Sequence, residues 1–148
     1  MEGETKRLKM KYSPKFIKEL KENEIFVFGS NLSGRHFAGA ADTARRFFGA
    51  EVGIGEGLTG KSYALPTKDL KIETLHLDKI KIHVNRFIDF AEESPQYVFL
   101  VTKIGTGLAG ITVAEIAPLF KRALDIENIR LPQEFVDSMN YDKVSRSV

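Results

Sequence analysis

The chain has 148 residues, which suits one domain that is large enough to bury a hydrophobic core. Hydrophobic residues make up 43% of the chain and charged residues 28%, so we expect a globular protein and not a disordered one. The absence of cysteine excludes disulfides, thiolate metal sites and cysteine nucleophiles. The net charge of +2 is too small to indicate a nucleic-acid-binding surface.

Residues 1–12 form a basic N-terminal stretch, and we expect a tail there, followed by a single domain over residues 13–148. The start has no apolar signal-peptide core, and no stretch approaches the roughly 18 apolar residues of a membrane span. We therefore expect a cytoplasmic protein without membrane contact. Ser13 as N-cap and Pro14 at the first helical position predict a short helix, with Phe16, Ile17 and Leu20 on its apolar face.

A strand, a glycine-rich loop and a helix are predicted next. Residues 25–28, IFVF, are apolar and partly β-branched, which is typical of a strand buried on both faces in a parallel sheet. Residues 29–39 form a glycine-rich, polar loop. The small residues at 38–48 predict a helix that Gly49 ends.

The middle of the chain contains the clearest helix. A loose stretch at residues 53–60 leads to a short predicted strand at 63–65, which Pro66 ends. Residues 77–92 then carry apolar side chains at helical spacing, and Ser94 with Pro95 ends that helix.

A second strand, loop and helix follow. Residues 97–101, YVFLV, predict a buried strand that leads into a glycine-rich loop at residues 105–110. Thr112 and Glu115 form a capping box for a helix that Pro118 is expected to kink. A last strand at 129–131 and a short helix at 133–139 complete an α/β fold with three α/β/α layers around a mostly parallel or mixed sheet.

The two strand, glycine-loop, helix units suggest a ligand site. Loops that leave the carboxyl ends of parallel strands gather at one edge of the sheet, where open α/β folds bind ligands. Glycine allows close approach of backbone N–H groups to an anion, and a following helix N-terminus adds a favourable dipole. Two such loops could hold a diphosphate. The alternative is that these glycines only form turns.

Two literal motif matches are rejected on context. Residues 105–110 match G-x-G-x-x-G, but Arg130 stands where a Rossmann domain has its acidic residue. Residues 55–62, GEGLTGKS, match the Walker A pattern, but Pro66 prevents the helix that must follow a P-loop. We therefore expect neither a dinucleotide-binding fold nor an NTPase.

Taken together, GSNLSGRHFAGAA, SYALPTK and VTKIGTGLAGITVAEIAPLF resemble the macrodomain superfamily, and more narrowly an uncharacterised phage- and bacterium-associated macro-like group. The resemblance covers about residues 24–125. It implies a domain that holds ADP-ribose, or an ADP-ribosylated protein, between two loops, with no cofactor and no metal. The ligand-binding residues it implies are Gly29, Ser30, Asn31, Gly34, Phe37, Gly39, Gly105, Thr106, Gly107, Leu108, Ala109 and Gly110.

The resemblance also assigns roles. Asn31 would contact the distal ribose, while residues 34–39 and 105–110 would form the first and second phosphate loops. LPTK is similar to the LITK segment of macrodomains that remove terminal ADP-ribose from proteins, in which the lysine is catalytic. Lys68 would then attack the anomeric carbon as a neutral amine. Two positions differ from the pattern, because Ala109 replaces the Asp of those hydrolases and Phe37 replaces the more common glycine.

Two side chains are candidates for acid–base chemistry, and several others have simpler explanations. Asp69 could substitute for the missing Asp, and His36 could donate to phosphate or act as a general acid, although a loop histidine is more often solvated. His76 and His83 have no third ligand at metal spacing. We expect Arg45 and Arg46 on the solvated side of their helix, and Glu24 is the nearest acidic candidate for an adenine pocket.

The alternatives to an ADP-ribosyl hydrolase are a non-catalytic reader of ADP-ribosylated partners and a phage-type accessory protein that binds nucleic acid. Ala109 favours the reader and Lys68 favours the enzyme. The basic tail supports the nucleic-acid alternative only weakly. The identity of the nucleotide and the oligomeric state are left open.

Overall fold

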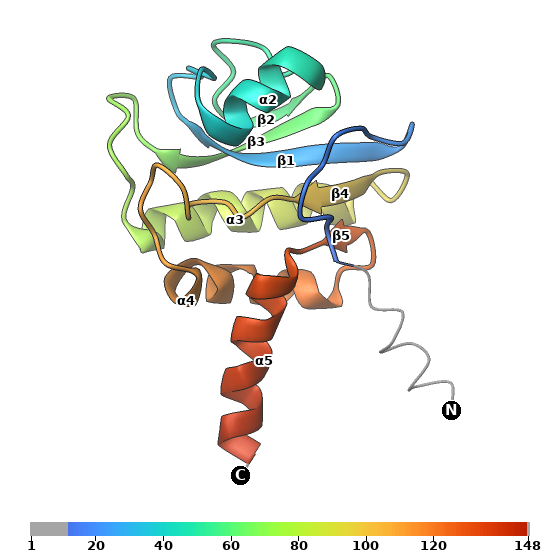
Figure 1. The fold of residues 1–148 in the computed structure, drawn as a ribbon, viewed down its shortest axis with the longest axis vertical. Coiled ribbons are helices and arrows are strands. Elements are labelled where there is room, and N and C mark those ends of the chain that lie inside the picture. The colour runs from blue at the N-terminus through green and yellow to red at the C-terminus, as the bar shows by residue number, and fades with distance from the viewer. Residues whose placement is uncertain (1–11, 148) are drawn as a thin grey trace.

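A computed structural model describes the backbone of residues 12–147 and the side chains of residues 12–140. Its centre is a five-stranded sheet in the order β2-β3-β1-β4-β5 (Figure 1). Strand β2 is antiparallel to β3, and the other neighbours are parallel. The chain is therefore an α/β protein with a mixed sheet. The strands are β1 (Glu24–Asn31), β2 (Gly57–Thr59), β3 (Ser62–Lys68), β4 (Val98–Val101) and β5 (Ile129–Arg130).

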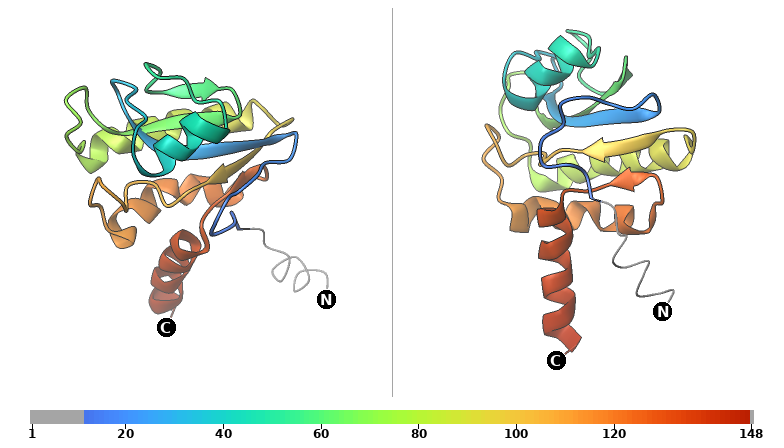
Figure 2. Two further views of the ribbon diagram at one scale, coloured as in Figure 1. Left: turned by 45° about the horizontal axis from the view of Figure 1, so that its top comes forward. Right: turned by 45° about the vertical axis from the view of Figure 1, so that its right-hand side comes forward.

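Helices cover both faces of this sheet (Figures 1 and 2). The predicted helix at residues 77–92 is confirmed in full, because its apolar spacing needs only local contacts to be recognised. The helices are α2 (Gly39–Phe47), α3 (Leu77–Glu92), α4 (Val113–Ile116), the 3₁₀ helix η1 (Ala117–Asp125) and α5 (Gln133–Ser147). The final helix is thus longer than predicted, and the final strand is shorter.

The two faces of the sheet are covered unequally. Alternate strand residues such as Val27, Leu65 and Val101 join the larger core with α3, η1 and the start of α5. The opposite face, with Phe26 and Phe28, packs mainly against the nine-residue helix α2. One short helix cannot cover that whole face, so the part of the face above β1 and β4 stays open.

Two strands are longer than the sequence predicts. Strand β1 continues past its apolar run to Asn31, so Gly29, Ser30 and Asn31 are strand residues and not loop residues. Strand β3 continues through Pro66 to Lys68. A proline is tolerated there because β2 pairs with β3 only as far as Ala64, which leaves the following residues at an edge.

The predicted helix at Ser13 is wrong. Residues 12–21 contain no helix; the Ser13 amide donates to the Leu131 carbonyl (3.0 Å), and its hydroxyl donates to the Val101 carbonyl (2.7 Å). The serine therefore fastens an extended segment to the ends of β4 and β5 instead of capping a helix. The basic stretch at residues 1–12 lies outside the described residues except for Tyr12.

The capping box before α4 is confirmed, and the effect of Pro118 is stronger than a kink. The Thr112 hydroxyl accepts from the Glu115 amide (3.2 Å), and the Glu115 carboxylate accepts from the Thr112 amide (3.1 Å). After one α-helical turn the chain changes to the 3₁₀ helix η1, with Pro118 in its first turn.

The rejected Walker A match, residues 55–62, contains β2 and the turn that leads into β3. It is therefore followed directly by a strand and not by a helix.

Candidate functional site

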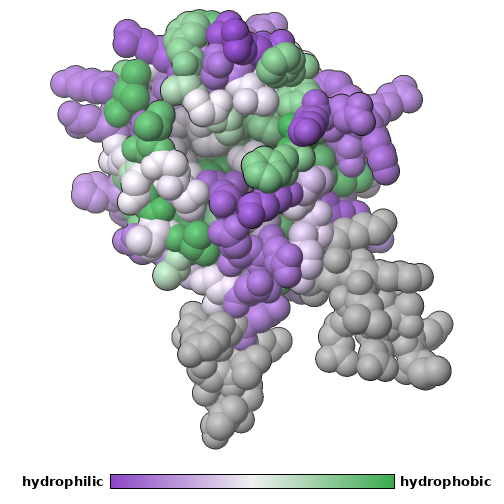
Figure 3. All heavy atoms as spheres, viewed as in Figure 1, coloured by the Kyte–Doolittle hydropathy of each residue, from purple (hydrophilic) through white to green (hydrophobic). Residues whose placement is uncertain are grey.

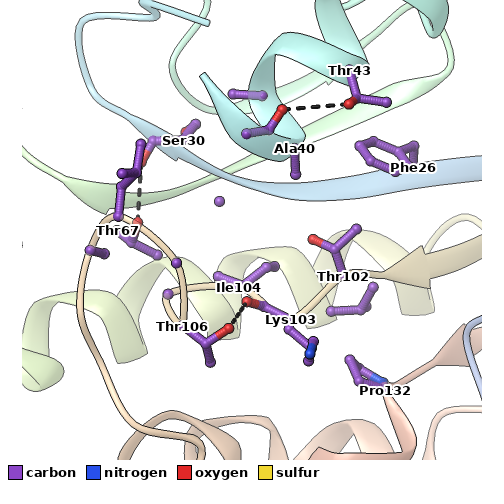
Figure 4. Close-up of a pocket in the computed structure, with 18 of the residues that line it drawn as sticks. Phe26, Ser30, Ala40, Thr43, Thr67, Thr102, Lys103, Ile104, Thr106 and Pro132 are labelled. Carbon is purple, nitrogen blue, oxygen red and sulfur yellow. Dashed lines mark hydrogen bonds between the residues drawn. The ribbon is translucent and has the colours of Figure 1, made fainter. Parts of the chain in front are cut away.

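A cleft of about 1020 Å³ lies at the carboxyl ends of β1, β3 and β4, which is the sheet edge predicted for the two glycine-rich loops. The start of α2 and the loop at residues 103–109 form two of its walls. Figure 4 shows Ala40 and Thr43 of α2 on one side, with Lys103 and Thr106 on the other. Residues 12–18 and the start of α5 also line the cleft. On the surface in Figure 3, hydrophobic and hydrophilic side chains alternate around a central hollow.

The first wall presents free backbone donors. Helix α2 has Ala38 at its N-cap, which provides no side-chain acceptor. Within residues 12–147, the amides of Gly39, Ala40 and Ala41 donate to no protein acceptor, and all three residues line the cleft. An anion placed there would gain these donors together with the positive end of the helix dipole.

The second wall is a loop with free donors of its own. Gly105 has φ of +83°, and its carbonyl accepts from the Ile111 amide (2.8 Å). A Cβ at Gly107 would meet no atom within 4 Å, so the cleft is open above this residue. The amides of Gly107, Leu108 and Ala109 have no acceptor among the described residues. This loop therefore offers N–H groups opposite those of α2.

The side chains make the cleft electropositive. Among the residues whose side chains are described, two carboxylates line it, and one of them, Glu134, pairs with Lys103 at 3.4 Å. An anionic ligand in the cleft would therefore meet more cationic side chains than carboxylates that repel it. The charged residues that line the cleft are Lys15, Lys18, Arg35, Lys68, Lys103, Glu134 and Asp137.

Asn31 lines the cleft but is already used to fold the adjacent turn. Its side-chain oxygen accepts from the Ser33 hydroxyl (2.8 Å) and the Arg35 amide (2.9 Å), and its Nδ2 donates to the Arg35 carbonyl (3.0 Å). The side chain is almost fully buried. One N–H of its amide is left for a ligand.

Gly29 and Ser30 support the floor of the cleft. A Cβ at Gly29 would lie 3.4 Å from Ile104 Cγ2 and 3.6 Å from the Gly105 nitrogen, so glycine lets β1 approach the second loop closely. The Ser30 hydroxyl donates to the Gly55 carbonyl. Gly29 therefore sets how closely the second loop approaches β1, and Ser30 bonds β1 to residue 55 through its side chain.

Two residues assigned to the first loop do not reach the cleft. A Cβ at Gly34 would lie 2.6 Å from Gly53 Cα, so this glycine serves packing between two loops. His36 is fully buried, donates from Nε2 to the Ile54 carbonyl (2.9 Å) and packs edge-on against Phe28. The prediction of a solvated or proton-donating His36 is wrong, because its loop folds back onto residues 53–54.

Asp69 has a structural role in its own turn, and its part in catalysis stays a prediction. Its Oδ1 accepts from the Lys71 amide (2.8 Å) and the Glu73 amide (3.0 Å), and it does not line the cleft. This turn holds Ile72 at φ of +65°, a strained conformation for a β-branched residue, and Ile72 lines the cleft, as Lys68 does. Sequence reasoning missed Ile72, since nothing local signals a positive φ.

Phe37 and Arg45 form a pair on the rim. The phenyl ring is 60% exposed and lines the cleft, and the Arg45 guanidinium carbon lies 5.1 Å from its centroid. Arg45 also donates to the His36 carbonyl (2.9 Å) and to Asp42 (2.6 Å). The predicted solvated position holds in part for Arg45, whose side chain is 34% exposed, and Arg46 is exposed as predicted.

Some of the remaining predicted positions line the cleft, and the others lie outside it. Thr106 and Leu108 line it, and the Leu108 side chain is 77% exposed. Gly110 lies outside it and borders a smaller hollow beside the start of α3. Glu24 is at the opposite end of β1, where its carboxylate accepts from the Lys21 amide (2.8 Å), so it cannot serve an adenine pocket here.

Within the described residues, no group of three or more His, Asp or Glu side chains is arranged to hold a metal ion. His83 instead bonds Glu56 through Nδ1 (2.7 Å), and Arg86 pairs with the same carboxylate. No helix in the described part of the chain combines the length and apolarity that a membrane crossing requires.

Comparisons with protein-family models, with curated proteins and with solved structures found no match to this chain. Function must therefore be inferred from the cleft. Its defining features are two facing sets of free backbone donors, an excess of cationic side chains and an exposed apolar rim.

Proposed function

We propose that this domain binds ADP-ribose or a related nucleotide diphosphate, with the diphosphate between the start of α2 and the loop at residues 105–109. The observation that carries the proposal is the pair of facing backbone walls whose N–H groups have no protein acceptor within the described residues. Hydrogen bonds from N–H groups to a charged acceptor contribute about 1.5–3 kcal/mol each. The macrodomain resemblance of the same two loops agrees with this ligand class.

The size of the cleft favours a ligand larger than a single phosphate. Small-molecule sites commonly measure roughly 300–1,000 Å³, and this cleft, at about 1020 Å³, is at the upper end. Its walls also differ in chemistry, since backbone donors line one part while exposed apolar side chains line the rim. A nucleotide diphosphate combines an anionic centre with a flat, less polar base and so suits both.

Hydrolysis of an ADP-ribosyl bond is the second candidate, and Lys68 is the observation that favours it. Lys68 ends β3 and lines the cleft, where its amine could attack the anomeric carbon as the bond to the modified protein breaks. The acidic residue that would assist this reaction is missing, because Ala109 stands at its position and Asp69 accepts hydrogen bonds from the backbone of its own turn. Binding without turnover is thus the better supported function.

Calorimetry with ADP-ribose tests the proposal, with ATP, NAD and AMP as comparison ligands. We expect ADP-ribose to bind more tightly than AMP, because AMP lacks the second phosphate. If none of the four ligands binds, the proposed site is refuted.

Two further measurements separate the alternatives. Lys68→Ala should abolish release of ADP-ribose from a modified protein if the domain is an enzyme, whereas a reader would release none in either form. Binding of single- or double-stranded nucleic acid that weakens steeply with salt would instead favour the accessory nucleic-acid-binding function.

A further inference from the structure

Phe37 is exposed in a way that packing does not explain. The residue is 60% exposed and belongs to neither hydrophobic core, yet it lines the cleft. An aromatic ring left in water at the rim of a cleft gains stability only when something covers it. The open face of Phe37 is therefore a candidate contact surface for a ligand.

The guanidinium of Arg45 lies over one face of the Phe37 ring. The guanidinium carbon lies 5.1 Å from the ring centroid, and the guanidinium is fixed by the His36 carbonyl and the Asp42 carboxylate. A cation on one face stabilises the ring and restricts its rotation. The other face is free to stack on a flat group with little further loss of entropy.

The position of the ring agrees with a base next to a phosphate. Phe37 precedes Gly39 by two residues, so it adjoins the free N–H groups at the start of α2. Leu108, 77% exposed, lines the same cleft from the loop on the opposite wall. A planar base between Phe37 and Leu108 would place the attached sugar and phosphate towards the backbone donors.

We propose that Phe37 is the stacking surface for the heteroaromatic base of the nucleotide, held in place by Arg45. This inference rests on the proposed nucleotide-binding function. It assigns the base to the rim formed by Phe37 and Leu108 and the phosphates to the backbone walls.

The absence of tryptophan from the chain allows a direct optical test. In Phe37→Trp the indole is the only one in the protein and keeps an aromatic surface at the rim. ADP-ribose should quench its fluorescence, while ribose 5-phosphate and pyrophosphate, which lack a base, should not. Phe47→Trp is the matched control, because Phe47 is 71% exposed at the end of the adjoining helix α2 but does not line the cleft. Its fluorescence should not respond.

Calorimetry on the full chain completes the test. Phe37→Ala should weaken ADP-ribose binding by roughly 5- to 100-fold, the range seen when a base loses its aromatic partner, and leave pyrophosphate binding unchanged. Equal losses for ADP-ribose and pyrophosphate, or no loss for either, would overturn the stacking role. If wild type binds pyrophosphate and ADP-ribose but Phe37→Trp is not quenched, only this inference fails. If wild type binds neither ligand, the proposed function fails with it.

Discussion

Gly107→Glu is the sharpest perturbation of the proposed phosphate site. A Cβ at this residue would meet no atom within 4 Å, and φ of Gly107 is outside the left-handed region. The residue is also exposed. The substitution should therefore change the free energy of unfolding by no more than about 0.5 kcal/mol, as is usual for surface positions.

The effect on binding should be large because the new carboxylate would face the ligand's diphosphate. Two unit negative charges about 5 Å apart repel by about 3 kcal/mol at an effective dielectric constant of about 20. That energy corresponds to a loss of affinity of more than about 100-fold. Added salt should reduce the loss, because the site is open to solvent.

The assay is calorimetric titration with ADP-ribose, with thermal unfolding measured on the same samples. Gly107→Gln is the matched control, because it adds nearly the same bulk without the charge. We expect Gln to weaken binding far less than Glu. A folded Gly107→Glu protein with wild-type affinity would refute the placement of the diphosphate, and equal losses for Gln and Glu would refute the electrostatic explanation.

Two further predictions concern stability. Asp69→Ala should lower the free energy of unfolding in urea by about 1–2 kcal/mol, because the Lys71 and Glu73 amides lose their acceptor. Asp69→Asn should retain most of the stability, and loss of ligand binding without loss of stability would contradict the structural role. Burial, with a smaller contribution from Glu56, raises the pKa of Tyr63 to about 12 from the ordinary 10.0. The folded state then holds this proton more tightly than the unfolded state, so stability should be constant below about pH 10 and fall by up to about 3 kcal/mol between pH 10 and 12. Urea unfolding of Tyr63→Phe against wild type should show a smaller fall, and parallel curves would disprove the assignment.

The elements that depend on local pattern were predictable. Helix α3 matches its expected range because its apolar side chains repeat at helical spacing, and the capping box of Thr112 and Glu115 is formed by residues three apart. The apolar runs at 25–28 and 97–101 identify two neighbouring parallel strands. The general rule for parallel sheets then placed the two glycine-rich loops at the same edge.

The failed predictions for Ser13 and His36 depended on partners distant in the chain. Ser13 binds the carbonyl of Val101, and His36 binds that of Ile54, so neither side chain does what its neighbours in sequence suggest. A serine before a proline has the same local pattern whether it caps a helix or fastens a strand. A loop histidine likewise becomes buried only if another loop folds over it.

The sequence by itself determined the α/β class, the order of the main elements and the edge of the sheet where a site can form, because hydrophobic period and glycine conformation act over a few residues. Only the tertiary structure decided which side chains face the cleft. It excluded His36, Gly34 and Asp69 from the cleft wall, added Ile72 to that wall and placed Arg45 against the ring of Phe37. That selection depends on packing between segments far apart in sequence, where burial and hydrogen-bond satisfaction are settled jointly.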